Sequence, residues 1–213
     1  RIADVLGLER CPDGVAPDCT SASCTRRLLA TADASVNAAT PDANLGATAS
    51  LEVDTDPDVE TLVRFDVPDL TGFDLSRATL RLTADSAVGS DGPAGGAVAA
   101  TSADWGESTV TWATRPRPIA PPLGTIGAIT RAQGVEVDVR DAVRRGAQNF
   151  VVTGTSPARV RYRSREAEES PPALVLTLRK STTPEITLTT PTSGLVVMPG
   201  EDVTLAATAS DAE

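Results

Sequence analysis

The sequence predicts an all-β fold, a β-sandwich, over residues 32–179. Short segments that alternate apolar and polar residues are separated by Gly, Pro, Asp and Ser, which is typical of sandwiches rather than of βαβ units. The two clearest segments are ETLVRFDV (60–67) and SRATLRLTAD (76–85). Because side chains alternate across a strand, each segment can bury one face in a core.

The other expected elements follow in chain order. VEVDV (135–139) repeats the alternation, and residues 150–153 and 173–178 are further expected strands. The segment DVRDAVRRGA (138–147) predicts one short helix, because Asp138 or Asp141 can cap its start and Gly146 its end. Trp105 and Trp112 flank GESTVT, and we expect them to be core and edge anchors of a hairpin rather than a platform for sugar rings.

Residues 1–31 are an expected extension that contains all three cysteines in a turn-rich loop. Such a loop buries little apolar surface, so we expect a disulfide to stabilise it. The pairing is either Cys11 with Cys19 or Cys11 with Cys24, and the third thiol is free or bonded to another chain.

The C-terminal part changes character. Residues 180–184 form a polar linker, and residues 185–213 show two or three strands that cannot enclose a core on their own. We therefore expect the chain to belong to a longer multidomain protein.

Composition excludes several classes of function. The formal net charge is -10, which disfavours nucleic acid and anionic lipid as partners. The absence of histidine excludes Ser-His-Asp and Cys-His catalysis and histidine-bearing zinc sites. No apolar run reaches the roughly 18 to 20 residues that span a bilayer, so we expect no membrane insertion. Aromatic residues make up only 3% of the chain, so recognition is expected to be polar.

Five segments together resemble a known family. They are RFDVPDL (64–70), ATLRLT (78–83), WGESTVTWATRP (105–116), VDVRDAV (137–143) and RSREAEESPPALVLTL (163–178).

In that order, these segments are similar to the DNRLRE-type domain, classed as carbohydrate-binding module family 96, over about 32–179. The opening ADASVNAATPDANLG (32–46) resembles the family's first strand and Asn-x-Gly loop. The resemblance implies a jelly-roll β-sandwich in a secreted or cell-surface bacterial protein, with alginate and related uronate polymers as ligands. The segment from about 184 is similar to the start of a bacterial immunoglobulin-like or PKD-like domain.

The segment RVRYRSRE (159–166) places an arginine at every second position: Arg159, Arg161, Arg163 and Arg165. In a strand all four guanidinium groups project from one face, where like charges repel unless an anionic partner neutralises them. An acidic polysaccharide is one such partner, because a guanidinium pairs bidentately with a uronate carboxylate. Acidic side chains of the chain itself are the alternative partner.

Three more residues are candidates for the same ligand site. Arg64 and Arg81 lie on the polar faces of their own expected strands and would extend the arginine patch. Tyr162, between two of the arginines, is the third candidate.

Two groups of acidic or amide residues are candidates for a structural calcium ion. Asp33, Asn44 and Glu166 fall in the opening strand, its loop and the later SRE turn, where calcium would tie the first and last strands together. The alternative is an ion pair between Arg165 and Glu166, with an Asx turn at Asn44. The alternating acids of EVDTDPDVE (52–60) are the second group, with a solvated acidic turn as the alternative.

The sequence therefore predicts a non-catalytic carbohydrate-binding module of a secreted or cell-surface protein, which binds acidic polysaccharide through an arginine-lined sheet face. The alternative is a structural or adhesive subunit of an extracellular fibre, assembled as a homo-oligomer through its terminal strands and its extension. A polysaccharide lyase that uses arginine and Tyr162 is disfavoured, because no histidine is present to act as a base.

Overall fold

The computed structural model describes residues 23–102, 104–181, 185–191 and 194–210. Cys11 and Cys19 lie outside these ranges, so the disulfide pairing stays a prediction. Cys24 lies in β1 (Ser23–Leu29), where its side chain is buried. Among the described residues, no helix is long and apolar enough to cross a membrane.

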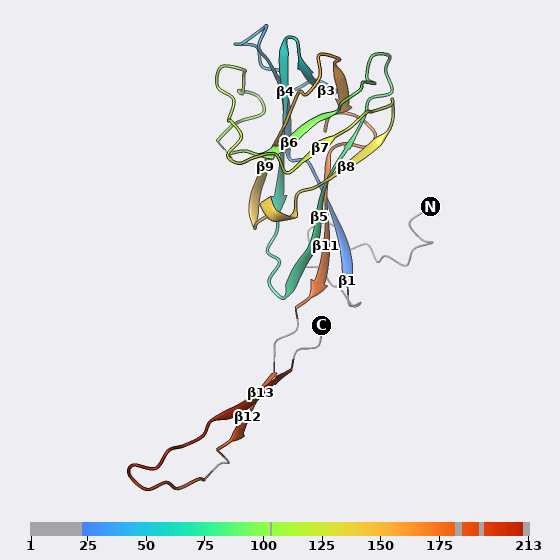
Figure 1. Ribbon diagram of the computed structural model, residues 1–213. Coiled ribbons are helices and arrows are strands. Elements are labelled where there is room, and N and C mark those ends of the chain that lie inside the picture. Colours follow the sequence, from blue (N-terminus) through green and yellow to red (C-terminus); the bar gives the residue numbers. More distant parts are fainter. Residues whose placement is uncertain (1–22, 103, 182–184, 192–193, 211–213) are drawn as a thin grey trace, which may run out of the picture.

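Two antiparallel sheets form a β-sandwich, which confirms the predicted fold class (Figure 1). The first sheet has the order β1, β11 (Ala173–Lys180), β5 (Phe73–Thr83) and β8 (Gly134–Asp138). The second has the order β10 (Val160–Arg163), β3 (Ser50–Thr55), β4 (Asp58–Val67), β9 (Gly146–Thr153), β6 (Gly96–Ala100) and β7 (Gly124–Ile126). In addition, β2 (Ala32–Asn37) pairs with β4.

The sandwich begins earlier than the predicted start at residue 32. Strand β1 pairs with β11 along its whole length, from Ser23 opposite Arg179 to Leu29 opposite Ala173. The last seven or so residues of the expected extension are therefore a strand of the first sheet.

The alternation seen in the sequence fills the space between the sheets. From β5, the side chains of Ala78, Leu80 and Leu82 are buried, and from β4 those of Val63 and Phe65 are buried. Full burial of one large apolar side chain contributes about 1.5–3 kcal/mol, so these strands supply much of the free energy that holds the sheets together.

A second apolar cluster covers the outer face of β4. Leu62, which the alternation assigns to the polar face, is buried there beside Trp105 and Val151. Trp112 packs against the edge of this cluster. The prediction that the tryptophans are anchors is confirmed, but both lie in the loop between β6 and β7 rather than in a hairpin.

The prediction of a short helix in residues 138–147, after β8, is wrong. The segment forms only a 3-10 turn, η2 (Arg140–Ala142), and β9 begins at Gly146. The buried side chains of Val139 and Val143 hold this segment against the sandwich, and the Val139 N–H donates to Ala78 O at 2.9 Å. Tertiary packing of β-branched residues therefore overrides the local helix signal.

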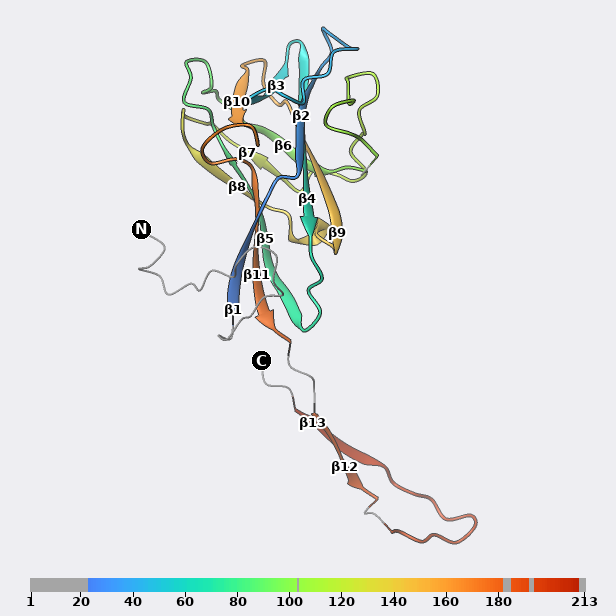
Figure 2. The same cartoon turned by 180° about the vertical axis from the view of Figure 1, so that it is seen from behind.

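The two sheets approach one another where β5 ends. Ala84 forms an isolated bridge with Tyr162 of β10, and the Asp85 N–H donates to Arg161 O at 2.9 Å. Figure 2 shows β10, β3 and β2 together at the end of the sandwich that lies away from the C-terminal hairpin. This end carries Arg161 and Arg163 of β10.

The C-terminal part forms a hairpin of β12 (Glu185–Thr190) and β13 (Ala206–Ser210), which extends away from the sandwich (Figures 1 and 2). Its apolar side chains Ile186, Leu188 and Leu205 are exposed. An immunoglobulin-like domain in this part of the chain stays a prediction.

Candidate functional site

Strand β10 carries Arg161 and Arg163, two of the four arginines that alternate in the sequence. Val160 and Tyr162 point into the core, whereas Arg161 and Arg163 project outward, as the two-residue period requires. Arg159 precedes the strand. We call these three arginines (Arg159, Arg161 and Arg163) the arginine face.

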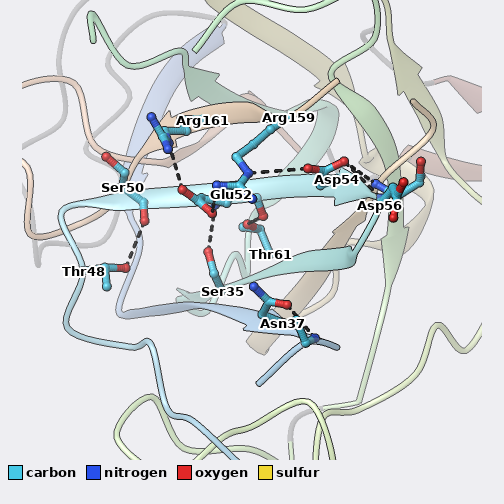
Figure 3. Close-up of polar contacts among 12 residues, drawn as sticks. Ser35, Asn37, Thr48, Ser50, Glu52, Asp54, Asp56, Thr61, Arg159 and Arg161 are labelled. Carbon is cyan, nitrogen blue, oxygen red and sulfur yellow. Dashed lines mark hydrogen bonds and ion pairs between the residues drawn. The ribbon is translucent and has the colours of Figure 1, made fainter. Parts of the chain in front are cut away.

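Acidic side chains of β3 neutralise two of these arginines (Figure 3). The Arg161 Nε donates to Glu52 Oε1 at 2.8 Å, and Arg159 lies 3.6 Å from Glu52 Oε2 and 3.4 Å from Asp54 Oδ2. Cross-strand pairing explains this arrangement, because Arg161 is the register partner of Glu52. All four side chains except that of Asp54 are partly exposed.

Arg163 is the least exposed member of the arginine face. Its side chain is 17% exposed, and Nη1 donates to Glu169 O at 3.2 Å and lies 3.4 Å from Glu169 Oε2. Asp85 is a second nearby carboxylate, and the Ser50 hydroxyl donates to its Oδ2 at 2.5 Å. This hydrogen bond lowers the pKa of Asp85, so the carboxylate stays ionised beside Arg163.

Tyr162 does not belong to this surface, which corrects the sequence-based assignment. Its side chain is 0% exposed, and its hydroxyl donates to Gly95 O at 2.7 Å inside the sandwich. Burial raises the pKa of Tyr162, so the phenol is a neutral core hydrogen-bond donor. A strand places adjacent residues on opposite faces, so a tyrosine between two outward arginines points inward.

Arg64 and Arg81 are held in surroundings of their own. Arg64 Nε donates to Asn149 Oδ1 at 2.9 Å, and its guanidinium lies 4.5 Å from the centre of the Trp105 ring, under the β6–β7 loop. Arg81 is half-exposed on β5 and lies 3.4 Å from Glu136. The structure thus shows neither of them in contact with the arginine face.

The acidic run 52–60 forms the β3–β4 hairpin rather than a cation-binding loop. Two of its carboxylates contact arginines of the arginine face, and Glu60 accepts a hydrogen bond from Arg115 Nε at 2.7 Å. Within the described residues, the run contributes to no group of three carboxylates that converge closely enough to hold a metal ion.

A different carboxylate group does converge. One oxygen atom from each of Asp33, Glu107 and Glu166 lies within 4.8 Å of the others. Two of these residues are the acidic candidates from the sequence, and Glu107 is new. It lies in the β6–β7 loop, and no local pattern in the sequence indicates that this loop reaches β2.

Asn44, the third predicted ligand, instead holds the Glu107 loop in place. Its side-chain amide donates to Glu107 O and to Val110 O, both at 2.8 Å, and its Oδ1 accepts from Gly46 N at 3.4 Å. A Cβ atom at Gly46 would lie 2.0 Å from Glu107 O, so only glycine fits there. The Asn-x-Gly sequence thus anchors the β6–β7 loop, and we call it the Asn-x-Gly seat.

The carboxylate group is unevenly charged. The Arg165 guanidinium donates to Glu107 Oε2 at 2.6 Å and lies 3.9 Å from Glu166 Oε1, so the alternative Arg165–Glu166 contact is also present. The Arg165 pKa is raised, first by the hydrogen bond to Glu107. Burial raises the pKa of Asp33 to about 7, helped by the charges of Glu166 and Glu107, against a backbone hydrogen bond from Arg165 that lowers it.

Another surface feature lies around η2. A depression of about 420 Å³ is lined by Leu123, Asp138, Arg140 and Asp141. No residue of the arginine face lines it.

The fold and these surfaces define the class of protein: an all-β sandwich that presents charged, hydrogen-bonding side chains on an open face. Residues 25–178 match the family model of carbohydrate-binding module family 96. The chain therefore belongs to that family of carbohydrate-binding modules. No curated protein matches the chain.

Proposed function

We propose that the protein binds acidic polysaccharide, and that the arginine face recognises its uronate carboxylates. Membership of a carbohydrate-binding family supports the general function. The observation that supports an acidic ligand is the row of outward guanidinium groups along strand β10 and just before it. We further propose that the protein acts without catalysis, as a module of a longer secreted or cell-surface protein.

The ion pairs on the arginine face are weak enough to be exchanged. Arg161 is 31% exposed and Glu52 is 26% exposed, and exposed pairs contribute about 0.2–1 kcal/mol each. When a polyuronate binds, its carboxylates replace the internal carboxylate partners of these guanidinium groups. Desolvation therefore changes little, and affinity comes from several such contacts along one polymer.

The affinity of such a surface is moderate and depends on salt. An open surface without stacking aromatics is expected to bind with dissociation constants between micromolar and millimolar. Exposed charges are screened over about 8 Å at physiological ionic strength, so binding should weaken as salt is added.

A double variant tests this proposal. Replacing Arg159 and Arg161 by glutamine removes two positive charges and leaves Glu52 and Asp54 unpaired, so the surface repels a polyanion. We expect at least about a tenfold loss of affinity for alginate or pectate in gel electrophoresis, which corresponds to about 1.4 kcal/mol.

The matched control changes the same charge elsewhere. Arg131 and Arg145 are both exposed and each pairs with one aspartate, Asp91 and Asp69 respectively. The double variant Arg131→Gln, Arg145→Gln should bind as the wild type does, and a neutral glucan should not be retained. Equal weakening by both double variants would reduce the proposal to a general effect of net charge.

The more severe change Arg163→Glu should abolish retention and cost about 1 kcal/mol or slightly more. Arg163 also donates to a backbone carbonyl, that of Glu169, so it contributes some stability. If Arg163→Glu unfolds the sandwich, the arginines are structural partners of the acids, and the proposal fails.

A structural role in an extracellular assembly is the second candidate function. It is favoured by the C-terminal hairpin, whose apolar side chains Ile186, Leu188 and Leu205 are each exposed. Sedimentation of the full chain at increasing concentration tests it. Association that Leu188→Lys abolishes would support the assembly role, and a monomer at all concentrations would exclude self-assembly.

A further inference from the structure

Three segments that are distant in the sequence meet at the group of Asp33, Glu107 and Glu166. Asp33 belongs to β2, Glu107 to the β6–β7 loop and Glu166 to the turn after β10. The Asp33 N–H donates to Glu107 Oε1 at 2.8 Å, and the Arg165 N–H donates to Asp33 Oδ2 at 2.7 Å. These contacts fix the carboxyl groups of Asp33 and Glu107 relative to the backbone, and Glu166 directly follows Arg165 in the chain.

One atom of this group lacks a partner. Asp33 is only 1% exposed, and among the described residues its Oδ1 is buried without any hydrogen-bond donor. Buried polar atoms in native proteins are almost always satisfied, and an isolated carboxylate oxygen without a partner is costly. The orphaned oxygen therefore points to a ligand that supplies positive charge.

Internal charges do not supply it. Among the described residues, one guanidinium, that of Arg165, forms ion pairs with this group, and it contacts Glu107 and Glu166. Two formal negative charges remain when all three carboxyl groups are ionised, which is the charge that a divalent cation balances.

The ligand atoms select the kind of cation. All three residues offer carboxylate oxygen, which hard cations such as calcium and magnesium prefer, whereas zinc sites usually include cysteine sulfur or histidine nitrogen. Two oxygens bound to one calcium ion can be about 4.6–5.2 Å apart, twice the usual bond length, against about 4.2 Å for magnesium. A group that spans up to 4.8 Å fits calcium better.

We propose that Asp33, Glu107 and Glu166 bind one calcium ion, which ties β2, the β6–β7 loop and the turn after β10 together. Asn44 and Gly46 do not bind the ion but position Glu107, because they contact its backbone carbonyl. Arg165 opposes the ion, since it competes for the same carboxylates.

Calcium titration of the full chain after chelator treatment tests the proposal. Calorimetry should show saturable binding of one ion per chain. At 100 times the dissociation constant, calcium should raise the melting temperature by about 5–11 °C, and magnesium by much less. Absence of calcium binding up to millimolar concentrations overturns the proposal, and equal binding of magnesium overturns the assignment to calcium.

Terbium, which replaces calcium in oxygen sites, locates the ion. Trp105 lies two residues before Glu107, so excitation of tryptophan should sensitise terbium emission, and added calcium should abolish it. Calcium binding without sensitised emission would place the ion elsewhere and overturn the site.

Variants separate these residues from other surface acids. Asp33→Asn and Glu166→Gln should each abolish the calcium-dependent shift, and Glu166→Gln serves if Asp33→Asn does not fold. The control is Glu169→Gln, a carboxylate three residues further on, 81% exposed and outside the group, which should bind calcium as the wild type does. Arg165→Gln should tighten binding, since it removes the competing charge. Wild-type affinity in both Asp33→Asn and Glu166→Gln overturns the proposal.

Discussion

The arginine face and the carboxylate group are adjacent in sequence and opposite in character. Only Ser164 separates Arg163 from Arg165, yet on one side arginines meet nearby acids at a partly exposed surface, and on the other three acids converge on one arginine around a buried oxygen. In the first region charge is nearly balanced and accessible. In the second it is unbalanced, and one of the three carboxyl groups, that of Asp33, is buried.

This difference assigns separate tasks to the two regions. Exposed pairs are exchangeable and contribute little to stability, so they suit recognition of a polymer from solution. A buried carboxyl group has a large effect on the stability of the fold, and that effect depends on whether a proton or a cation compensates its charge. We therefore expect changes around Asp33 to affect stability, and changes around Glu52 to affect binding.

The largest expected effect is the pH dependence that Asp33 contributes in chelator. The pKa of Asp33 is about 7 in the folded chain against an ordinary value of 3.8, so the folded state keeps this proton up to a higher pH than the unfolded state does. Stability from this group is complete below about pH 4 and is lost as pH rises through about 7, by about 4 kcal/mol at most.

Urea unfolding of the wild type and of Asp33→Asn at pH 4, 5.5 and 7.5 measures this effect. The variant lacks the titrating group, so its stability relative to the wild type should increase with pH. Parallel pH profiles would show that Asp33 is ionised at its ordinary pKa, and the contrast between the two regions would weaken.

An intermediate effect is expected at Gly46. In Gly46→Ala the new methyl group meets Glu107 O, so the β6–β7 loop must move, at a cost of about 1–3 kcal/mol. Gly127→Ala is the matched control, because a Cβ there has no atom within 4 Å. Equal melting temperatures for the two variants would mean that the loop adapts without cost, and that the Asn-x-Gly seat is not needed.

The smallest effect on stability is expected at Glu52, where binding should change instead. Glu52→Gln removes the carboxylate shared by Arg159 and Arg161, at a cost below about 1 kcal/mol. Retention on polyuronate gels should increase, because the two guanidinium groups lose an internal competitor. A loss of several kcal/mol with unchanged retention would instead assign the arginine face to folding.

Much of the fold follows from the sequence alone. The two-residue period in segments such as SRATLRLTAD predicts which side chains are buried, because alternation is a property of the extended backbone itself. The same rule places Arg161 and Arg163 on one surface, and applied consistently it also places Tyr162 inside. The sequence therefore contains enough information to place Tyr162 in the core and not in the ligand site.

Tertiary structure decided the rest. Leu62 breaks the alternation only because a distant loop covers it, and the valines after β8 prevent a helix only because a core is there to receive them. Glu107 joins Asp33 and Glu166 across 74 and 59 residues of chain, through backbone contacts that exist only when the strands of the second sheet are assembled. Local periodicity is fixed by covalent geometry, whereas the meeting of distant loops depends on how the whole sandwich packs, so the sequence predicted the strands and the arginine face but not the third carboxylate.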